Sequence, residues 1–119
     1  MIESTYNTYA ELKELVAANG DVLTVKMESL RNVHGAGKLG VHVRAGISGE
    51  LHKQGLGHFP DELPNYYWDE VRLFTQGTQV SRLIEAARSV GDDHDTVIRE
   101  LVEVDASDTL QKVRELVCA

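Results

Sequence analysis

The sequence predicts a mainly helical α+β fold with one small β-hairpin. Apolar residues recur every three or four positions in several segments, which is the period of an amphipathic helix. Two short runs, at 22–25 and 71–74, are rich in β-branched or aromatic residues and have strand propensity. The length of 119 residues and the 42% hydrophobic content suit a single domain over 1–119.

The N-terminal part is predicted to fold as helix, strand and helix. Thr8 followed three residues later by Glu11 is the pattern of a capping box, and the helix that it begins stops at Asn19-Gly20. A brief strand is expected over 22–25. A second helix then ends near Gly35, because apolar residues follow at three-residue spacing: Met27, Leu30 and Val33.

A third helix is predicted over about 39–54, after a glycine-rich turn. Its apolar side repeats every four residues, as Leu39, Val43, Ile47 and Leu51. The other side, at about 100° per residue, carries His42, Ala45, Gly46, Gly49, His52 and Lys53. Glycine inside a helix costs roughly 1 kcal/mol relative to alanine, so the two glycines need a compensating reason. Either the backbone approaches a nucleic-acid groove or the glycines admit a neighbouring helix; both explanations are open.

The β-hairpin is expected to follow an extended loop. Both prolines lie between Gly57 and Asn65, where they favour an extended connection. The strand at 71–74 is predicted to pair with a partner arm around His58 and Phe59. Four of the seven aromatic residues gather beside it: Tyr66, Tyr67, Trp68 and Phe74. We expect them to form a core between the hairpin and the third helix; the alternative is an outward surface for a protein partner.

The C-terminal residues, 78–118, are predicted to form a helical extension. Thr78 and Asp92-Asp93 are suitable N-caps for two helices, and a last helix closes the chain. The apolar stripes are Val80, Leu83, Ile84 and Ala87; Val97, Ile98, Leu101 and Val102; and Leu110, Val113, Leu116 and Val117. The apolar area of these stripes is large for so small a domain, so we expect the extension to pack against the same segment of a second copy in a homodimer.

Charge singles out residues 26–59. This window contains five Lys and Arg residues and only two Glu residues, although the net charge of the whole chain is −7. Four of the five histidines also lie in this window, and histidine gains positive charge as the pH falls through about 6.5. Basic side chains on a helix can contact phosphates, and the release of counterions makes such contacts favourable. The predicted nucleic-acid contacts are Lys38, His42, Arg44, His52, Lys53 and Arg72.

Residues 22–76 resemble a winged helix-turn-helix module in their order of helix, glycine turn, amphipathic helix, extended loop and aromatic strand. The segments that carry a closer likeness are Gly35-Ala36-Gly37-Lys38-Leu39-Gly40, Gly55-Leu56, Pro60-Asp61-Glu62 and Trp68-Asp69 to Val71. They look like the HARE-type winged helices attached to restriction, modification and chromatin proteins. The resemblance implies that the third helix is the recognition helix, which enters the major groove. It also implies that Arg72, with Gln76, Thr78 and Gln79, occupies or borders the wing.

No enzymatic or metal-binding pattern is recognised. The Gly37-Lys38 pair is followed by Leu39, where a P-loop requires Ser or Thr. The histidines lack a recognised i, i+4 ligand pair, and the single cysteine, Cys118, stands next to the C-terminus without a nearby histidine in sequence. The acids at 92–95 are interpreted as a helix cap with first-turn carboxylates. We therefore expect a non-enzymatic protein without metal or cofactor.

Two functions are consistent with these features. The first is a non-catalytic DNA-binding or regulatory module, such as a transcription regulator, that uses the helix at about 39–54. The second is an adaptor or inhibitor, of a defence or phage-related system, that binds protein and not DNA. Asp61, Glu62, Asp69 and Glu70 lie close in sequence to the proposed DNA surface and disfavour the first function. In the second function the acidic helices engage a basic partner. No run approaches the roughly 18 apolar residues of a membrane span and no signal peptide is evident, so we expect a cytoplasmic protein.

Overall fold

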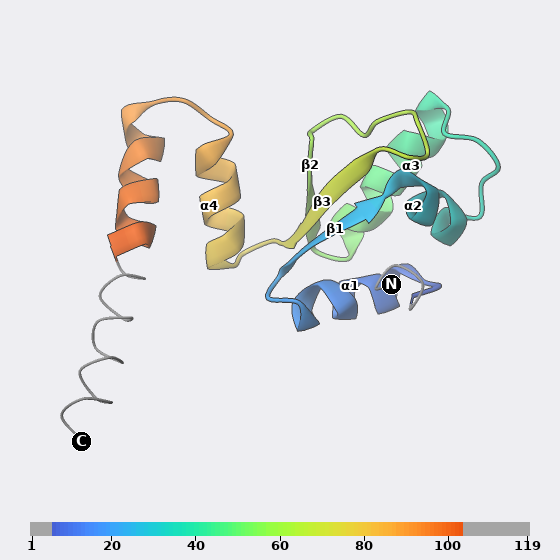
Figure 1. Ribbon diagram of the computed structural model, residues 1–119, viewed down its shortest axis with the longest axis horizontal. Coiled ribbons are helices and arrows are strands. Elements are labelled where there is room, and N and C mark those ends of the chain that lie inside the picture. The colour runs from blue at the N-terminus through green and yellow to red at the C-terminus, as the bar shows by residue number, and fades with distance from the viewer. Residues whose placement is uncertain (1–5, 104–119) are drawn as a thin grey trace, which may run out of the picture. The chain divides into compact units, whose positions relative to one another are not determined.

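The computed structural model describes residues 6–103 and confirms the mainly helical α+β class. The elements follow in the order α1 (Tyr9–Ala18), β1 (Val22–Lys26), α2 (Met27–His34), α3 (Val41–Lys53), β2 (Leu56–Phe59), β3 (Glu70–Thr75) and α4 (Gln79–Ala87) (Figure 1). Residues 92–103 are also helical. The strands form an antiparallel sheet in the order β1-β3-β2. Helices α2 and α3 precede a β2–β3 hairpin, and the predicted partner arm at His58 and Phe59 is confirmed.

The chain divides into two compact units, Met1–Val80 and Ser81–Ala119. The first unit contains the sheet and α1 to α3, and α4 begins just before the boundary. The last predicted helix, which includes Leu110 and Val113, lies outside the described residues, as does Cys118. Among the helices of residues 6–103, none combines the length and apolar character that crossing a bilayer requires.

Local signals explain where the helices begin and end. The amide of Glu11 donates a hydrogen bond to Thr8 Oγ1 at 3.1 Å, which is the N-cap that the capping-box pattern predicts. Gly35 ends α2 with a φ of 78°, a left-handed conformation that favours glycine. Helix α3 begins at Val41, two residues later than the apolar repeat suggests. Leu39 lies in the preceding turn and still packs against the core.

The core of the first unit lies on one face of the sheet. The register pairs Val25 with Val71 and Leu23 with Leu73, so these side chains share that face. Helices α1, α2 and α3 supply the other side of the core. The fully buried members are Leu12, Val16, Val25, Met27, Leu30, Ile47, Leu51, Leu56, Val71 and Leu73. Burial of one such side chain stabilises a fold by about 1.5 to 3 kcal/mol, so the apolar side of α3 is firmly anchored.

Phe74 is buried on the opposite face of the sheet. Side chains alternate along a strand, so Phe74 points away from the face that carries Leu73. Its neighbour across the ladder is Gly57, and a Cβ atom added to Gly57 would lie 2.4 Å from Phe74 Cε2. Only glycine leaves room for the ring at this position.

The expectation of an aromatic core between the hairpin and α3 is wrong. Tyr66, Tyr67 and Trp68 are exposed, and Phe74 is buried on the other face of the sheet. The physical reason is that the three exposed residues belong to the loop before β3, and not to the strand. The backbone of this loop caps α2, because the Tyr67 carbonyl accepts a hydrogen bond from the Glu28 amide at 2.9 Å.

We expect Gly57→Ala to lower the free energy of unfolding by about 1 to 3 kcal/mol, because Phe74 must shift to admit the methyl group. Gly49→Ala is the matched control. No atom lies within 4 Å of a Cβ at Gly49, and its place inside α3 favours alanine, so we expect a gain of about 0.5 to 1 kcal/mol. Urea denaturation of the full chain measures both changes, and effects of the same sign would contradict this packing.

Candidate nucleic-acid interface

One side of α3 faces solvent because the other side is buried through Ile47 and Leu51. The exposed residues of this side are Val41, His42, Ala45, Gly49, His52 and Lys53, which we call the α3 face. Three residues of the predicted contact set therefore share one helix surface: His42, His52 and Lys53. Lys38 is exposed in the turn that leads into α3. The α3 face combines small residues with cationic or protonatable ones.

Lys53 is available to an outside partner in spite of its ion pair. Its Nζ atom lies 3.2 Å from Glu50 Oε1, and the two side chains are 72% and 39% exposed. An exposed pair of this kind contributes at most about 1 kcal/mol. A phosphate group can therefore compete with Glu50 for the ammonium group.

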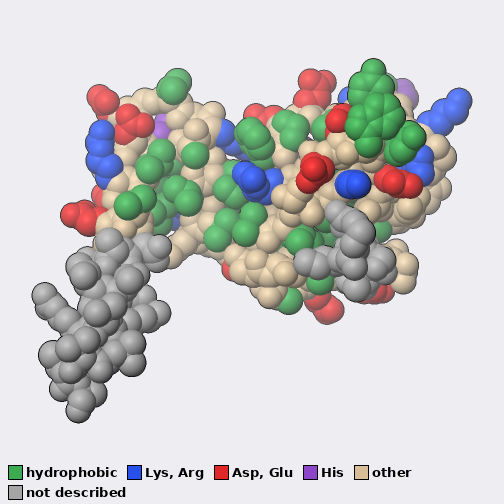
Figure 2. Space-filling view, viewed as in Figure 1, with side chains coloured by type: hydrophobic (Ala, Val, Ile, Leu, Met, Phe, Trp, Pro, Cys, Tyr) green, Lys and Arg blue, Asp and Glu red, His purple; other side chains and the backbone are tan. Residues whose placement is uncertain are grey.

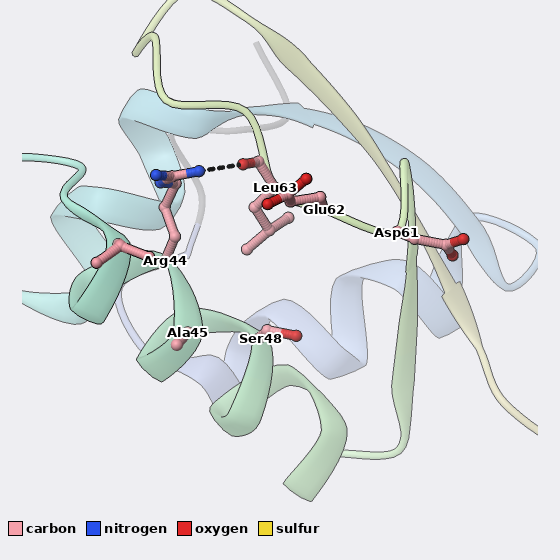
Figure 3. Close-up of a pocket in the computed structure, with 7 residues that line it drawn as sticks. Arg44, Ala45, Ser48, Asp61, Glu62 and Leu63 are labelled. Carbon is pink, nitrogen blue, oxygen red and sulfur yellow. Dashed lines mark hydrogen bonds between the residues drawn. The ribbon is translucent and has the colours of Figure 1, made fainter.

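Arg44 has a structural role in the fold. Its Nε donates a hydrogen bond to the Leu39 carbonyl at 3.2 Å, and its Nη1 donates to the Leu63 carbonyl at 3.1 Å. Figure 3 shows the second bond crossing from α3 to the loop between β2 and β3. The side chain is half-buried, so Arg44 does not belong to the α3 face.

Arg72 also lies apart from the α3 face. It is exposed on β3 and pairs across the sheet with Thr24 and Phe59. Alternation along β3 places it on the opposite face of the sheet from Val71 and Leu73, which pack in the core beneath the helices. The structure does not bring Arg72 together with His42, His52 and Lys53.

The two glycines within α3 have different surroundings. A Cβ at Gly46 would lie 3.0 Å from Cε1 and 3.1 Å from Nε2 of the His34 ring, so Gly46 admits a side chain of the neighbouring α2. At Gly49 no atom lies within 4 Å of the added Cβ. Gly49 leaves the backbone of α3 open to an outside partner.

Two of the four histidines at 26–59 hold the fold together. Tyr9 Oη lies 2.8 Å from His34 Nδ1, and burial, followed by the charge of Glu50, raises the pKa of Tyr9 to about 12. The hydroxyl thus stays protonated, and its hydrogen bond with His34 links α1 to α2. His58 Nδ1 lies 2.8 Å from the Pro60 carbonyl, and His58 Nε2 lies 2.8 Å from Ser48 Oγ. Since a carbonyl only accepts, Nδ1 donates and Nε2 accepts the Ser48 proton.

The Ser48–His58 pair was not anticipated, since the two residues lie ten positions apart and no motif joins them. Ser48 also lines an open pocket of about 210 Å³ between α3 and the β2–β3 loop (Figure 3). The pocket is lined by Val41, Arg44, Ala45, Ser48, Asp61, Glu62 and Leu63. The two carboxylates of the pocket disfavour a phosphate there. The loop therefore limits the part of the α3 face that could contact DNA to the side that carries His42 and Lys53.

The α3 face combines an ammonium group and imidazole rings with small side chains. Across residues 6–103, no three His, Cys, Asp or Glu side chains are grouped so as to hold a metal ion. No protein-family model, curated protein sequence or solved structure matches the chain. The functional argument therefore depends on the arrangement of the residues themselves.

We expect Arg44→Met to lower the free energy of unfolding by about 1 to 3 kcal/mol, because the buried Leu63 residue loses its charged hydrogen-bond donor. Arg72→Met removes the same charge from an exposed strand position, where we expect a change within about 0.5 kcal/mol. Equal losses in urea denaturation of the two variants would show that Arg44 does not anchor the loop.

Proposed function

We propose that the protein is a non-catalytic winged-helix module that binds double-stranded DNA with the α3 face. The observation that carries the proposal is the order of elements, in which α2 and α3 precede the β2–β3 hairpin while the α3 face stays uncovered. In helix-turn-helix proteins the second helix of the pair lies in the major groove. A relation to HARE-type winged helices, and a role in transcription regulation, belong to the same proposal.

The composition of the α3 face supports insertion into a groove. The major groove of B-DNA admits an α-helix, and the open space at Gly49, where no atom lies within 4 Å of an added Cβ, lets the helix backbone come close to the bases. Lys53 at the end of α3 and Lys38 before its start can then reach phosphates on either side. With so few cations and a net charge of −7, we expect modest affinity that depends strongly on salt.

Exposed apolar residues beyond the first unit support a dimeric form of the proposal. Leu83, Val90 and Val102 are 40%, 99% and 60% exposed. A homodimer formed through residues 78–118 would present two α3 helices to one duplex, as dimeric helix-turn-helix proteins do. Sedimentation of the full chain distinguishes the dimer from a monomer.

The test is fluorescence anisotropy of the full chain with a labelled mixed-sequence duplex, across a salt series at pH 6 and pH 8. We expect binding that weakens as the salt concentration rises, because each phosphate contact releases counterions. Absence of binding at about 50 mM salt at both pH values would reject the DNA proposal and favour the protein-binding adaptor.

Lys53→Glu is expected to weaken duplex binding and to reduce the slope of log affinity against log salt by about one, since one phosphate contact is lost. Lys13→Glu makes the same charge change at an exposed position of α1 and serves as the control. Equal weakening in both variants would mean that net charge, and not the α3 face, determines the affinity.

A further inference from the structure

We propose that Tyr66, Tyr67 and Trp68, here called the aromatic loop, bind a Lys- or Arg-bearing segment of a protein partner. The aromatic loop belongs to the connection between β2 and β3 and contributes no residue to the α3 face, so the inference does not depend on DNA binding. It names a second surface and the chemistry of its partner.

The rings of the aromatic loop form one exposed cluster. Tyr66 stacks on Trp68 with ring centroids 4.8 Å apart and an interplanar angle of 15°. Tyr67 meets Trp68 edge-on at 4.9 Å and 79°. The three residues are 53%, 49% and 55% exposed, respectively for Tyr66, Tyr67 and Trp68. A contiguous exposed group of large aromatic side chains is characteristic of an interaction site.

Backbone hydrogen bonds hold the aromatic loop in place. The amide of Asp69 donates to the Tyr66 carbonyl at 3.1 Å, and the amides of Glu28 and Met27 donate to the carbonyls of Tyr67 and Asp69 at 2.9 Å each. The last two bonds satisfy amides at the start of α2, which has no side-chain N-cap. A partner therefore meets rings that are already ordered, so little conformational entropy is lost on binding.

The charges around the cluster favour a cationic partner. Residues 60–70 contain no Lys or Arg and four carboxylates, at Asp61, Glu62, Asp69 and Glu70. Two cations come from other segments: Arg31 lies over the Tyr67 ring, and Lys26 stands opposite Glu70 in the ladder. Figure 2 shows acidic side chains beside hydrophobic ones on the surface of the first unit. Carboxylates attract ammonium and guanidinium groups and repel phosphates. A basic protein segment fits this surface better than a nucleic acid does.

The structure itself contains an example of the proposed contact. Arg31 Cζ lies 5.8 Å from the centroid of the Tyr67 ring, a cation–π arrangement. Trp68, whose indole is the strongest cation–π acceptor among the side chains, has more than half of its surface open to solvent. We infer that a Lys or Arg of the partner sits against Trp68 while neighbouring basic residues meet Asp61 and Glu62.

The test uses a fluorescein-labelled ten-residue peptide of alternating Arg and Gly, with the alternating Glu and Gly peptide as the charge control. Trp68 is the only tryptophan of the chain, so its fluorescence reports directly on the site. We expect the Arg peptide to bind saturably and with an affinity that falls as salt rises, and we expect the Glu peptide not to bind. Anisotropy should show at least about fivefold weaker binding for Trp68→Ala, and a reduced salt slope for Asp61→Asn combined with Glu62→Gln. Leu83→Ala, at another exposed hydrophobic residue, should bind as the wild type does.

Three results would overturn the proposal. The first is that binding of the Arg peptide does not saturate up to about 1 mM. The second is that the Trp68→Ala variant binds the Arg peptide as tightly as the wild type does. The third is that a labelled dT15 oligonucleotide binds more tightly than the Arg peptide. If circular dichroism shows that Trp68→Ala does not fold, the salt slope of Arg-peptide binding by the double variant Asp61→Asn and Glu62→Gln is the test of the proposal.

Discussion

Burial of Ile47 and Leu51 is the constraint on which the functional surface depends. Both side chains are fully buried in the core, so the rotation of α3 about its own axis is fixed. That rotation turns Gly46 toward His34 and leaves Gly49 open. It also directs His42, His52 and Lys53 away from the core. The exposure of the α3 face is thus a consequence of hydrophobic packing, and its charged residues contribute little to the fold that presents them.

The β2–β3 loop is the second organising feature, and it divides the surface into two kinds of chemistry. Arg44 holds the loop through the Leu63 carbonyl, and the amides of Met27 and Glu28 hold it at the start of α2. The guanidinium group is thereby withdrawn from phosphate binding. The loop in turn presents aromatic rings among carboxylates. The α3 face and the acidic aromatic loop thus differ in charge, and the two proposals assign them partners of opposite charge.

The parts of the fold that were predicted correctly depend on local signals. The turn at Gly35 marks the end of α2, and the apolar four-residue repeat with the stop at Gly55 gives the bounds of α3 to within two residues, because each signal acts within its own helix. The functions of Arg44 and Arg72 depend on distant partners. Arg44 is committed to a carbonyl nineteen residues away, and the side of the sheet that Arg72 occupies follows from strand register. The outward aromatic loop likewise depends on α2 amides that periodicity does not reveal.

The most direct test of the α3 face is a ¹H–¹⁵N NMR titration of the full chain with a mixed-sequence DNA duplex at low salt. Backbone amides report contacts residue by residue, and the open backbone at Gly49 places one reporter at the centre of the proposed interface. We predict that the largest chemical-shift changes fall within 38–53, on the exposed side of α3, with Gly49 among them. Changes that centre on 66–68 while those of α3 stay small would contradict binding through the α3 face.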